Sequence, residues 1–296
     1  MVGKGCDPYG ILQNHQGEIK EERRMNQNFF KNIKGVTLIE LLIALVISAV
    51  LTAGIYRAFI HQQKSYTTQE QVADMQQNAR VAINRMMREI RMAGCGNVQG
   101  VLPVSFLGGT RTYNDVVNLD TPVAGALTIV SAIGGSAVLT AQPASNQIQV
   151  NSLAEFDTND KKYISIGGLE CHFITAIDAG NKILTLNSDL SRVYNNGTTF
   201  VYSIRAISYR IAPDSQGKPV LRRDENTGGG FQPMANNIEN IEFRNPDGTI
   251  PLNPNSTSMQ VAVTAMTDRP DPELKVGDGY RRRQFTSIIL QRNRGL

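Results

Sequence analysis

The feature that most constrains this chain is an unbroken apolar run near its N-terminus, residues 36–56. These 21 residues contain no Lys, Arg, Asp, Asn or Pro, and Glu40 is the one charged side chain among them. A helix of about 20 apolar residues is long enough to cross a bilayer. The Leu, Ile, Val and Ala that dominate the run leave such a helix no aqueous face. We therefore expect Val36 to Tyr56 to form a membrane-spanning helix.

Glu40 is an anomaly within this run. An unpaired carboxylate among lipid tails costs at least about 2.5 to 3.5 kcal/mol, so its presence needs an explanation. One explanation is that Glu40 lies near the edge of the span and reaches the interface. The other is that a cationic group pairs with it once chains associate, which makes the charge tolerable.

The residues just before the run bear on this choice. Lys34-Gly35-Val36-Thr37-Leu38-Ile39-Glu40 places a basic residue, Gly, an apolar residue, Thr, Leu and Glu ahead of the apolar segment. This pattern resembles the processing site of type IV prepilins and pseudopilins, although Val36 stands where Phe is usual. The resemblance implies that a prepilin peptidase cleaves after Gly35 and methylates the new amino group of Val36. It also implies that Glu40 pairs with the terminal amine of a neighbouring subunit as a filament assembles.

The segment ahead of the cleavage site, residues 1–35, is expected to be a leader peptide. Residues 1–24 show neither a helix nor a strand period, whereas Met25 begins an eleven-residue basic stretch that ends at Gly35. We therefore expect translation to start at Met25. A secretory signal has its apolar core before the cut, but here the cut precedes the core, which stays with the mature chain.

Residues 57–96 continue the helix in amphipathic form. Apolar residues recur at intervals of three and four, as in a helix packed on a core: Val72, Met75, Ala79, Ala82, Ile83, Met86, Ile90 and Ala93. Polar residues are expected on the opposite, exposed face: Gln69, Glu70, Asp74, Arg80, Arg85, Arg88 and Glu89. No Pro interrupts the segment, and Gly94-Cys95-Gly96 is expected to end the helix at about Ala93.

From Asn97 to the end of the chain the period switches to two, which is typical of β-strands. The runs that alternate are 127–130, 147–150, 163–166, 171–177, 182–186, 199–211, 259–265 and 285–290. Asp178-Ala179-Gly180-Asn181 lies between two of them and predicts a hairpin. The expected fold class is α+β: a long N-terminal helix packed on an antiparallel β-rich head, residues 97–296.

Several segments of the head are similar to PilW/PulJ-type minor pilins. They are Ile207–Ile211, Gly217–Arg222, Met234–Phe243, Asp247-Gly248 and Arg283–Asn293. The resemblance implies a single pass through the bacterial inner membrane, with the head outside the cytoplasm, and later incorporation into a pilus or pseudopilus. The implied partners are prepilin peptidase, other minor and major pilins, the inner-membrane assembly platform and membrane lipid.

Charge and cysteine content set further bounds. The formal net charge is +4, and it falls to +2 without residues 1–35, which hold six Lys or Arg and four Asp or Glu. So small a balance indicates no nucleic-acid partner. Cys6 would be lost with the leader, which leaves Cys95 and Cys171. An even pair outside the cytoplasm is a disulfide candidate; the alternative is two buried thiols.

Side chains that could carry chemistry are few. Asp268, Asp271 and Asp278 crowd a Pro- and Gly-rich loop, and such oxygen-rich loops can bind calcium. Their spacing matches no EF-hand, so a solvated loop is the simpler interpretation. His61 and His172 do not share a metal-ligand spacing, and no set of nucleophile, base and orienting group is visible. We expect neither a cofactor nor an enzymatic activity.

These observations favour a structural minor pilin that primes assembly of a type IV pilus and lies at or near its tip. The first alternative is a pseudopilin of type II secretion. The second is a single-pass inner-membrane receptor or binding protein that never polymerises. Glu40 discriminates between them, because only a polymerising subunit needs this carboxylate.

Overall fold

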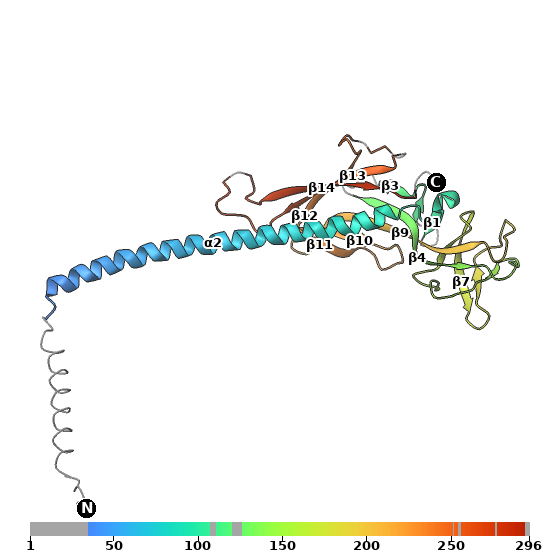
Figure 1. The fold of residues 1–296 in the computed structure, drawn as a ribbon, viewed down its shortest axis with the longest axis horizontal. Coiled ribbons are helices and arrows are strands. Elements are labelled where there is room, and N and C mark those ends of the chain that lie inside the picture. Colours follow the sequence, from blue (N-terminus) through green and yellow to red (C-terminus); the bar gives the residue numbers. More distant parts are fainter. Residues whose placement is uncertain are drawn as a thin grey trace, which may run out of the picture. The chain divides into compact units, whose positions relative to one another are not determined.

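The computed structural model describes residues 35–106, 111–119, 126–250, 252–253, 256–275 and 277–293. The predicted leader, with Cys6 and the Met25 start, lies outside the described residues apart from Gly35. The chain divides into two compact units, residues 1–65 and residues 66–296, and Figure 1 labels the elements. The fold class is α+β, as the sequence predicts.

The first element is one long helix, α2 (Leu38–Arg91), of 54 residues. It confirms the helix expected over residues 36–93, with two residues fewer at each end. A turn follows at Met92, and two glycines in it, Gly94 and Gly96, have φ angles of 76° and 79°. Glycine adopts this left-handed conformation without steric cost, which explains why the helix ends here.

Within residues 66–296, the apolar stripe of α2 faces the core. Met75, Ala79, Ala82, Ile83, Met86 and Ile90 are all buried, as the three-and-four spacing predicts. The prediction for Glu89 is wrong: its side chain is buried instead of exposed. The carboxylate of Glu89 accepts hydrogen bonds from Arg85, Tyr209 and Arg223. Buried charges are tolerated when they are paired in this way.

Every strand predicted from alternation overlaps an observed strand, but the structure adds several more. The strands are β1 (Val104–Phe106), β2 (Arg111–Tyr113), β3 (Val117–Leu119), β4 (Leu127–Val138), β5 (Gln147–Gln149), β6 (Tyr163–Ile166), β7 (Glu170–Asp178), β8 (Ile183–Leu186), β9 (Phe200–Pro213), β10 (Pro219–Asp224), β11 (Gln232–Asn236), β12 (Ile238–Arg244), β13 (Ser258–Met266) and β14 (Arg282–Leu290), and a short 3-10 helix η1 covers Val98–Val101. The hairpin predicted at residues 178–181 joins β7 and β8, which pair antiparallel.

The long strand β9 organises the larger sheet, which has nine strands. It pairs antiparallel with β4 along residues 200–209. It also pairs with β6 near its start and with β10 near its end. The remaining strands continue from these: β3 lies beside β4, β11 lies beside β10, and β7, β8 and β5 follow beyond β6. All the described strand pairs are antiparallel, as alternation in the sequence predicts.

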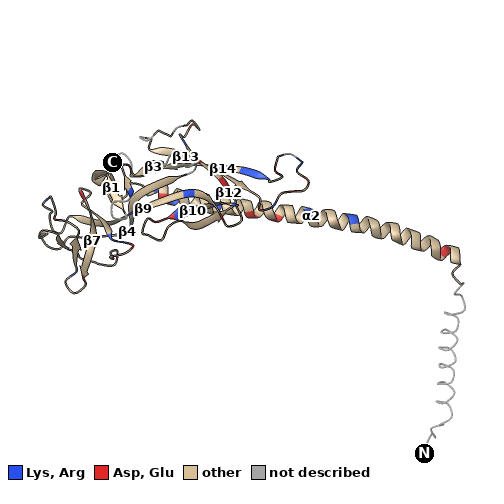
Figure 2. Ribbon diagram, turned by 180° about the vertical axis from the view of Figure 1, so that it is seen from behind, with Lys and Arg blue, Asp and Glu red and all other residues tan. Residues whose placement is uncertain are grey.

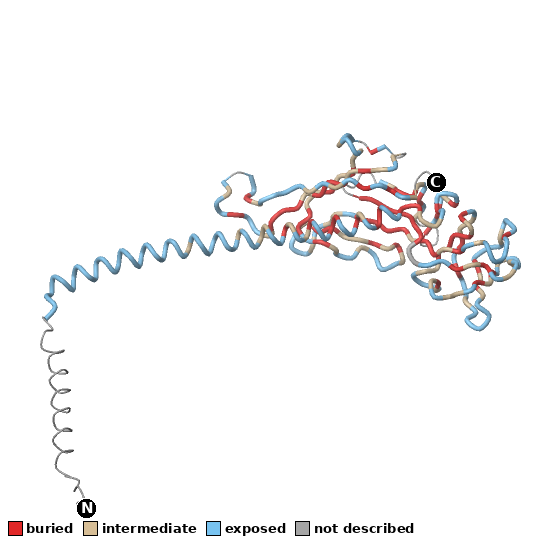
Figure 3. The backbone as a smooth tube through the Cα atoms, viewed as in Figure 1, coloured by how far each residue is buried: buried red, intermediate tan, exposed pale blue. Residues whose placement is uncertain are grey.

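A separate three-stranded sheet, β12-β13-β14, closes the main core against α2. This core joins the buried stripe of α2 to Ile129, Tyr209, Val261 and Ile289, which lie on four strands of the two sheets. A second core lies among β5, β6, β7 and β8, with Ile148, Ile164 and Leu184 fully buried. The part of the head that contains β5 to β8 therefore has an apolar core of its own. Figure 3 shows this buried interior in red.

Candidate functional site

The predicted processing site leads directly into the start of α2. Gly35, Val36 and Thr37 precede the helix. The hydroxyl Oγ1 of Thr37 accepts a hydrogen bond from the backbone N–H of Glu40 at 3.3 Å. The backbone N–H of Leu41 donates to the Thr37 carbonyl at 3.1 Å. Thr37 is therefore the N-cap of α2, and Thr37-Leu38-Ile39-Glu40 has the spacing of a capping box, a signal that the sequence contains and that our sequence analysis missed.

The helix that follows is fully exposed over its apolar part. The best 18-residue window of α2 has a mean hydropathy of 2.5, and 0% of it is buried within the protein. By length and composition α2 can cross a membrane. Figure 2 shows how sparse the charged positions are along this first half of the helix. So much unpartnered apolar surface needs lipid or other chains to cover it.

Glu40 is the one acidic residue in the first turn of α2. Its backbone is held by the Thr37 cap, and a carboxylate at this end of a helix is favoured by the helix dipole. The structure therefore places the charge at the start of the apolar segment and not at its middle. The space around Gly35 is open, because a Cβ added there would meet no atom within 4 Å.

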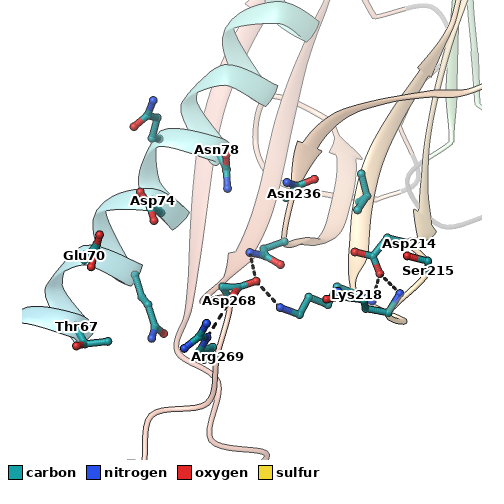
Figure 4. A pocket seen from close by; sticks show the side chains of 15 residues that line it. Thr67, Glu70, Asp74, Asn78, Asp214, Ser215, Lys218, Asn236, Asp268 and Arg269 are labelled. Atoms are coloured by element: carbon teal, nitrogen blue, oxygen red, sulfur yellow. Dashed lines mark hydrogen bonds and ion pairs between the residues drawn. The ribbon is translucent and has the colours of Figure 1, made fainter. Parts of the chain in front are cut away.

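A polar groove lies within the second unit, beside the part of α2 that follows the apolar segment. Its volume is about 710 Å³, and one wall is a helix face whose spacing repeats at three and four: Thr67, Glu70, Gln71, Asp74, Gln77 and Asn78. Figure 4 shows this helix face on one side and the loop with Asp214 and Lys218 on the other. We call this feature the polar groove.

The far wall of the polar groove comes from loops of the head. Asp214 accepts hydrogen bonds from the backbone N–H groups of Gln216 and Lys218 at 2.8 and 2.9 Å, so its carboxylate holds its own turn. The ammonium group of Lys218 lies 2.5 Å from a carboxylate oxygen of Asp268. Hydrogen bonds from Lys218 lower the pKa of Asp268, which therefore stays ionised. In sequence these wall residues are far apart, so no motif could predict the groove.

A second polar cluster, also missed from the sequence, fixes the loop after β8. Ser188 Oγ lies 3.2 Å from His172 Nδ1, and His172 Nε2 lies 3.0 Å from Glu170. Glu170 also accepts hydrogen bonds from the Ser191 N–H and the Tyr194 hydroxyl. Burial raises the pKa of Glu170, but these hydrogen bonds outweigh it and the pKa is lowered. The cluster unites a hydroxyl, an imidazole and a carboxylate, and it ties residues 188–194 to β7.

The two remaining cysteines are free thiols in the structure. Both pack against the same apolar cluster. The carbonyl of Cys95 accepts a hydrogen bond from Ala132 in β4, whereas Cys171 lies in β7, and β9 and β6 separate these two strands. The disulfide stays a prediction, which thiol counting tests.

The acidic loop proposed for calcium is occupied by cationic side chains. Asp271 pairs with Arg281 at 2.5 Å and Asp278 with Arg282 at 2.6 Å. Among the described residues, no three His, Cys, Asp or Glu side chains gather in a way that could hold a metal ion. Together with the Lys218 pair of Asp268, these contacts favour the solvated loop over a calcium site.

The comparison with known proteins bears on the N-terminal segment. Residues 30–56 match the family model of the prokaryotic N-terminal methylation motif. No curated protein and no solved structure matches the chain. The matched segment contains Gly35, Val36 and Glu40, and it continues into the apolar part of α2. The motif and the membrane-capable helix support a type IV pilin or pseudopilin-like protein, a structural subunit that fits an anchor in the inner membrane.

Proposed function

We propose that this protein is a minor pilin of the PilW/PulJ type that primes assembly of a type IV pilus and is incorporated at or near its tip. A prepilin peptidase cleaves after Gly35 and methylates Val36. Before assembly the mature chain is anchored in the inner membrane with its head outside the cytoplasm. Other minor and major pilins and the assembly platform are its partners.

One observation carries the proposal: a carboxylate, Glu40, stands at the capped start of a helix whose apolar part nothing in the described chain covers. After cleavage the new amino terminus at Val36 lies one helical turn from this carboxylate in sequence. The amine of a neighbouring subunit can then neutralise Glu40, while the apolar helix surfaces pack on one another. Both the charge and the exposed surface are accounted for by the same event.

The direct test is the mass of the N-terminal peptide of the protein purified from membranes. We expect a chain that begins at N-methylated Val36. A chain that keeps residues 1–35 would overturn the proposal.

The role of Glu40 is tested by Glu40→Gln, which removes the charge and leaves a side chain that the capping box accepts. We expect loss of filament incorporation with membrane insertion unchanged. Thr37→Ala is the matched control, because it removes the cap and keeps the carboxylate, and incorporation should survive. A non-polymerising receptor would be indifferent to both changes. A type II secretion pseudopilin would respond in the same way, and is distinguished by the filament in which the protein is found.

A further inference from the structure

Between Glu40 and Glu70 the chain has no acidic residue, and its charged side chains there are Arg57 and Lys64, with His61 between them. These three positions are four and three residues apart on α2, so they share one helix face. All three are exposed. We call this surface the basic face. It spans about 10 Å of helix, at 1.5 Å per residue.

The polar groove has the opposite character. Its lining includes four carboxylates, Glu70, Asp74, Asp214 and Asp268, against two cations, Lys218 and Arg269, a net charge of −2. Asp214 and Asp268 are engaged by backbone N–H groups and by Lys218. Glu70 and Asp74 make no ion pair with any described residue, and both are exposed on the helix wall.

We propose that the polar groove receives the basic face of a second copy of this chain. The inference rests on the proposed function in one respect, because the two copies must lie parallel, as in a filament. They must also be displaced along the helix axis by about 12 residues, or about 18 Å, so that residues 57–64 of one copy reach residues 67–78 of the next. Arg57 and Lys64 of one copy then lie against Glu70 and Asp74 of the next. The helix wall of the groove, residues 67–78, extends over about 16 Å and has room for the 10 Å of the basic face. The lining amides of Gln71, Gln77 and Asn78 offer further hydrogen bonds to the guanidinium and ammonium groups.

Loss of one ion pair should weaken the contact only slightly, whereas loss of two should weaken it measurably. Charge reversal replaces the attraction of each exposed ion pair by a repulsion. Reversal of both members of one surface should therefore weaken the contact about tenfold. Because salt screens exposed charges over about 10 Å at 0.1 M, the contact should also weaken as ionic strength rises.

The experiment is zero-length carbodiimide cross-linking of the full chain in detergent, where no bilayer holds the two apolar helices at one depth, with a mixture of 15N-labelled and unlabelled copies. A link between Lys64 and Glu70 or Asp74 that contains one labelled and one unlabelled peptide can come only from two chains. We expect such mixed links in the wild type and about tenfold fewer dimers in 1 M salt. Lys64→Arg keeps the charge, so it should remove the link at that position without removing the contact.

Two charge-reversed variants make the test independent of folding defects. Copies with Arg57→Glu and Lys64→Glu, or with Glu70→Lys and Asp74→Lys, cannot form this link with themselves, because neither variant offers both an amine and a carboxylate at positions 64, 70 and 74. When the two variants are mixed, the reversed face fits the reversed groove, and cross-links between positions 64 and 70 or 74 should return. Absence of mixed links in the wild type, or no recovery on mixing, would overturn the inference. If these cross-links are absent while the mature N-terminus is Val36 and Glu40→Gln blocks assembly, only the groove contact is overturned and the proposed function stands.

Discussion

We expect the buried carboxylate of Glu89 to contribute strongly to the stability of the packing between α2 and the nine-stranded sheet. Its side chain is 9% exposed and accepts hydrogen bonds from Arg85 Nε at 2.7 Å and Arg223 Nε at 3.2 Å. The hydroxyl of buried Tyr209 donates to its second oxygen. Burial, and then the nearby carboxylate of Glu89, raises the pKa of Tyr209, so this hydroxyl stays protonated as a donor. Glu89→Gln removes the charge and leaves the shape of the side chain nearly unchanged.

The size of the effect follows from what the substitution leaves behind. Loss of one partner of a buried ion pair costs about 3 to 5 kcal/mol. Arg223 keeps a second partner, Glu225, at 2.6 Å, and Arg85 is 46% exposed to water. We therefore expect the lower end, about 3 kcal/mol of unfolding free energy. For a unit the size of residues 66–296, this corresponds to a Tm lower by about 6 to 12 °C.

Thermal unfolding of the full chain in detergent measures this shift. The chain has nine Tyr and no Trp, so near-ultraviolet circular dichroism of the tyrosines is the appropriate signal. Glu70→Gln is the matched control: the same substitution on the same helix, at an exposed side chain without an ion pair among the described residues. It should change the unfolding free energy by no more than about 0.5 kcal/mol. If Glu89→Gln behaves like Glu70→Gln, the reasoning is refuted.

Three further predictions concern the head. Gly96→Ala should lower the free energy of unfolding by about 2 to 4 kcal/mol, because the new Cβ would lie 2.7 Å from that of Ala132 at a φ of +79°. Gly197→Ala is the control: it has a similar φ and open space around it, so it should lower the free energy of unfolding by about 1 kcal/mol. Equal Tm shifts for the two variants would contradict this prediction. Because the pKa of Glu170 is lowered in the folded protein, its ionised carboxylate stabilises the fold above the ordinary pKa of 4.5, and this stabilisation is lost as pH falls below that value. Glu170→Gln should therefore reduce the acid-induced fall in Tm. An unchanged pH dependence of Tm would contradict this role of Glu170. Burial raises the pKa of the Cys171 thiol to about 12, so alkylation at pH 8 should be at least about a hundredfold slower in the folded than in the unfolded chain; thiols that appear only after reduction would instead support the disulfide.

The sequence by itself determined the features that depend on local periodicity. The apolar run and its one carboxylate are visible in the residues 36–56, and the helix they form needs no other part of the chain. The spacing of Met75, Ala79 and Met86 predicted the buried face of α2, because a helix repeats every 3.6 residues wherever it packs. Alternation likewise located the longer strands, and Gly180 marked the β7–β8 hairpin.

Only the tertiary structure decided which distant segments meet. Strands β1, β2 and β3 have only three residues each and were not predicted. Strands β10, β11 and β12 are longer, but bulges at Leu221/Arg222 and Ile238/Asn240 interrupt the regular pairing in this region, and they were not predicted from alternation either. Glu89 has the spacing of the buried stripe, three residues after Met86, and it was assigned to the exposed face because it is charged. Its burial is tolerated because Arg223 and Tyr209, more than 100 residues later, pair with the carboxylate. The polar groove has the same origin, because its walls come from α2 and from loops after β9 and β13. The local sequence pattern predicts which face of a helix or strand a residue lies on. Which residues it contacts depends on how the sheets pack around the helix.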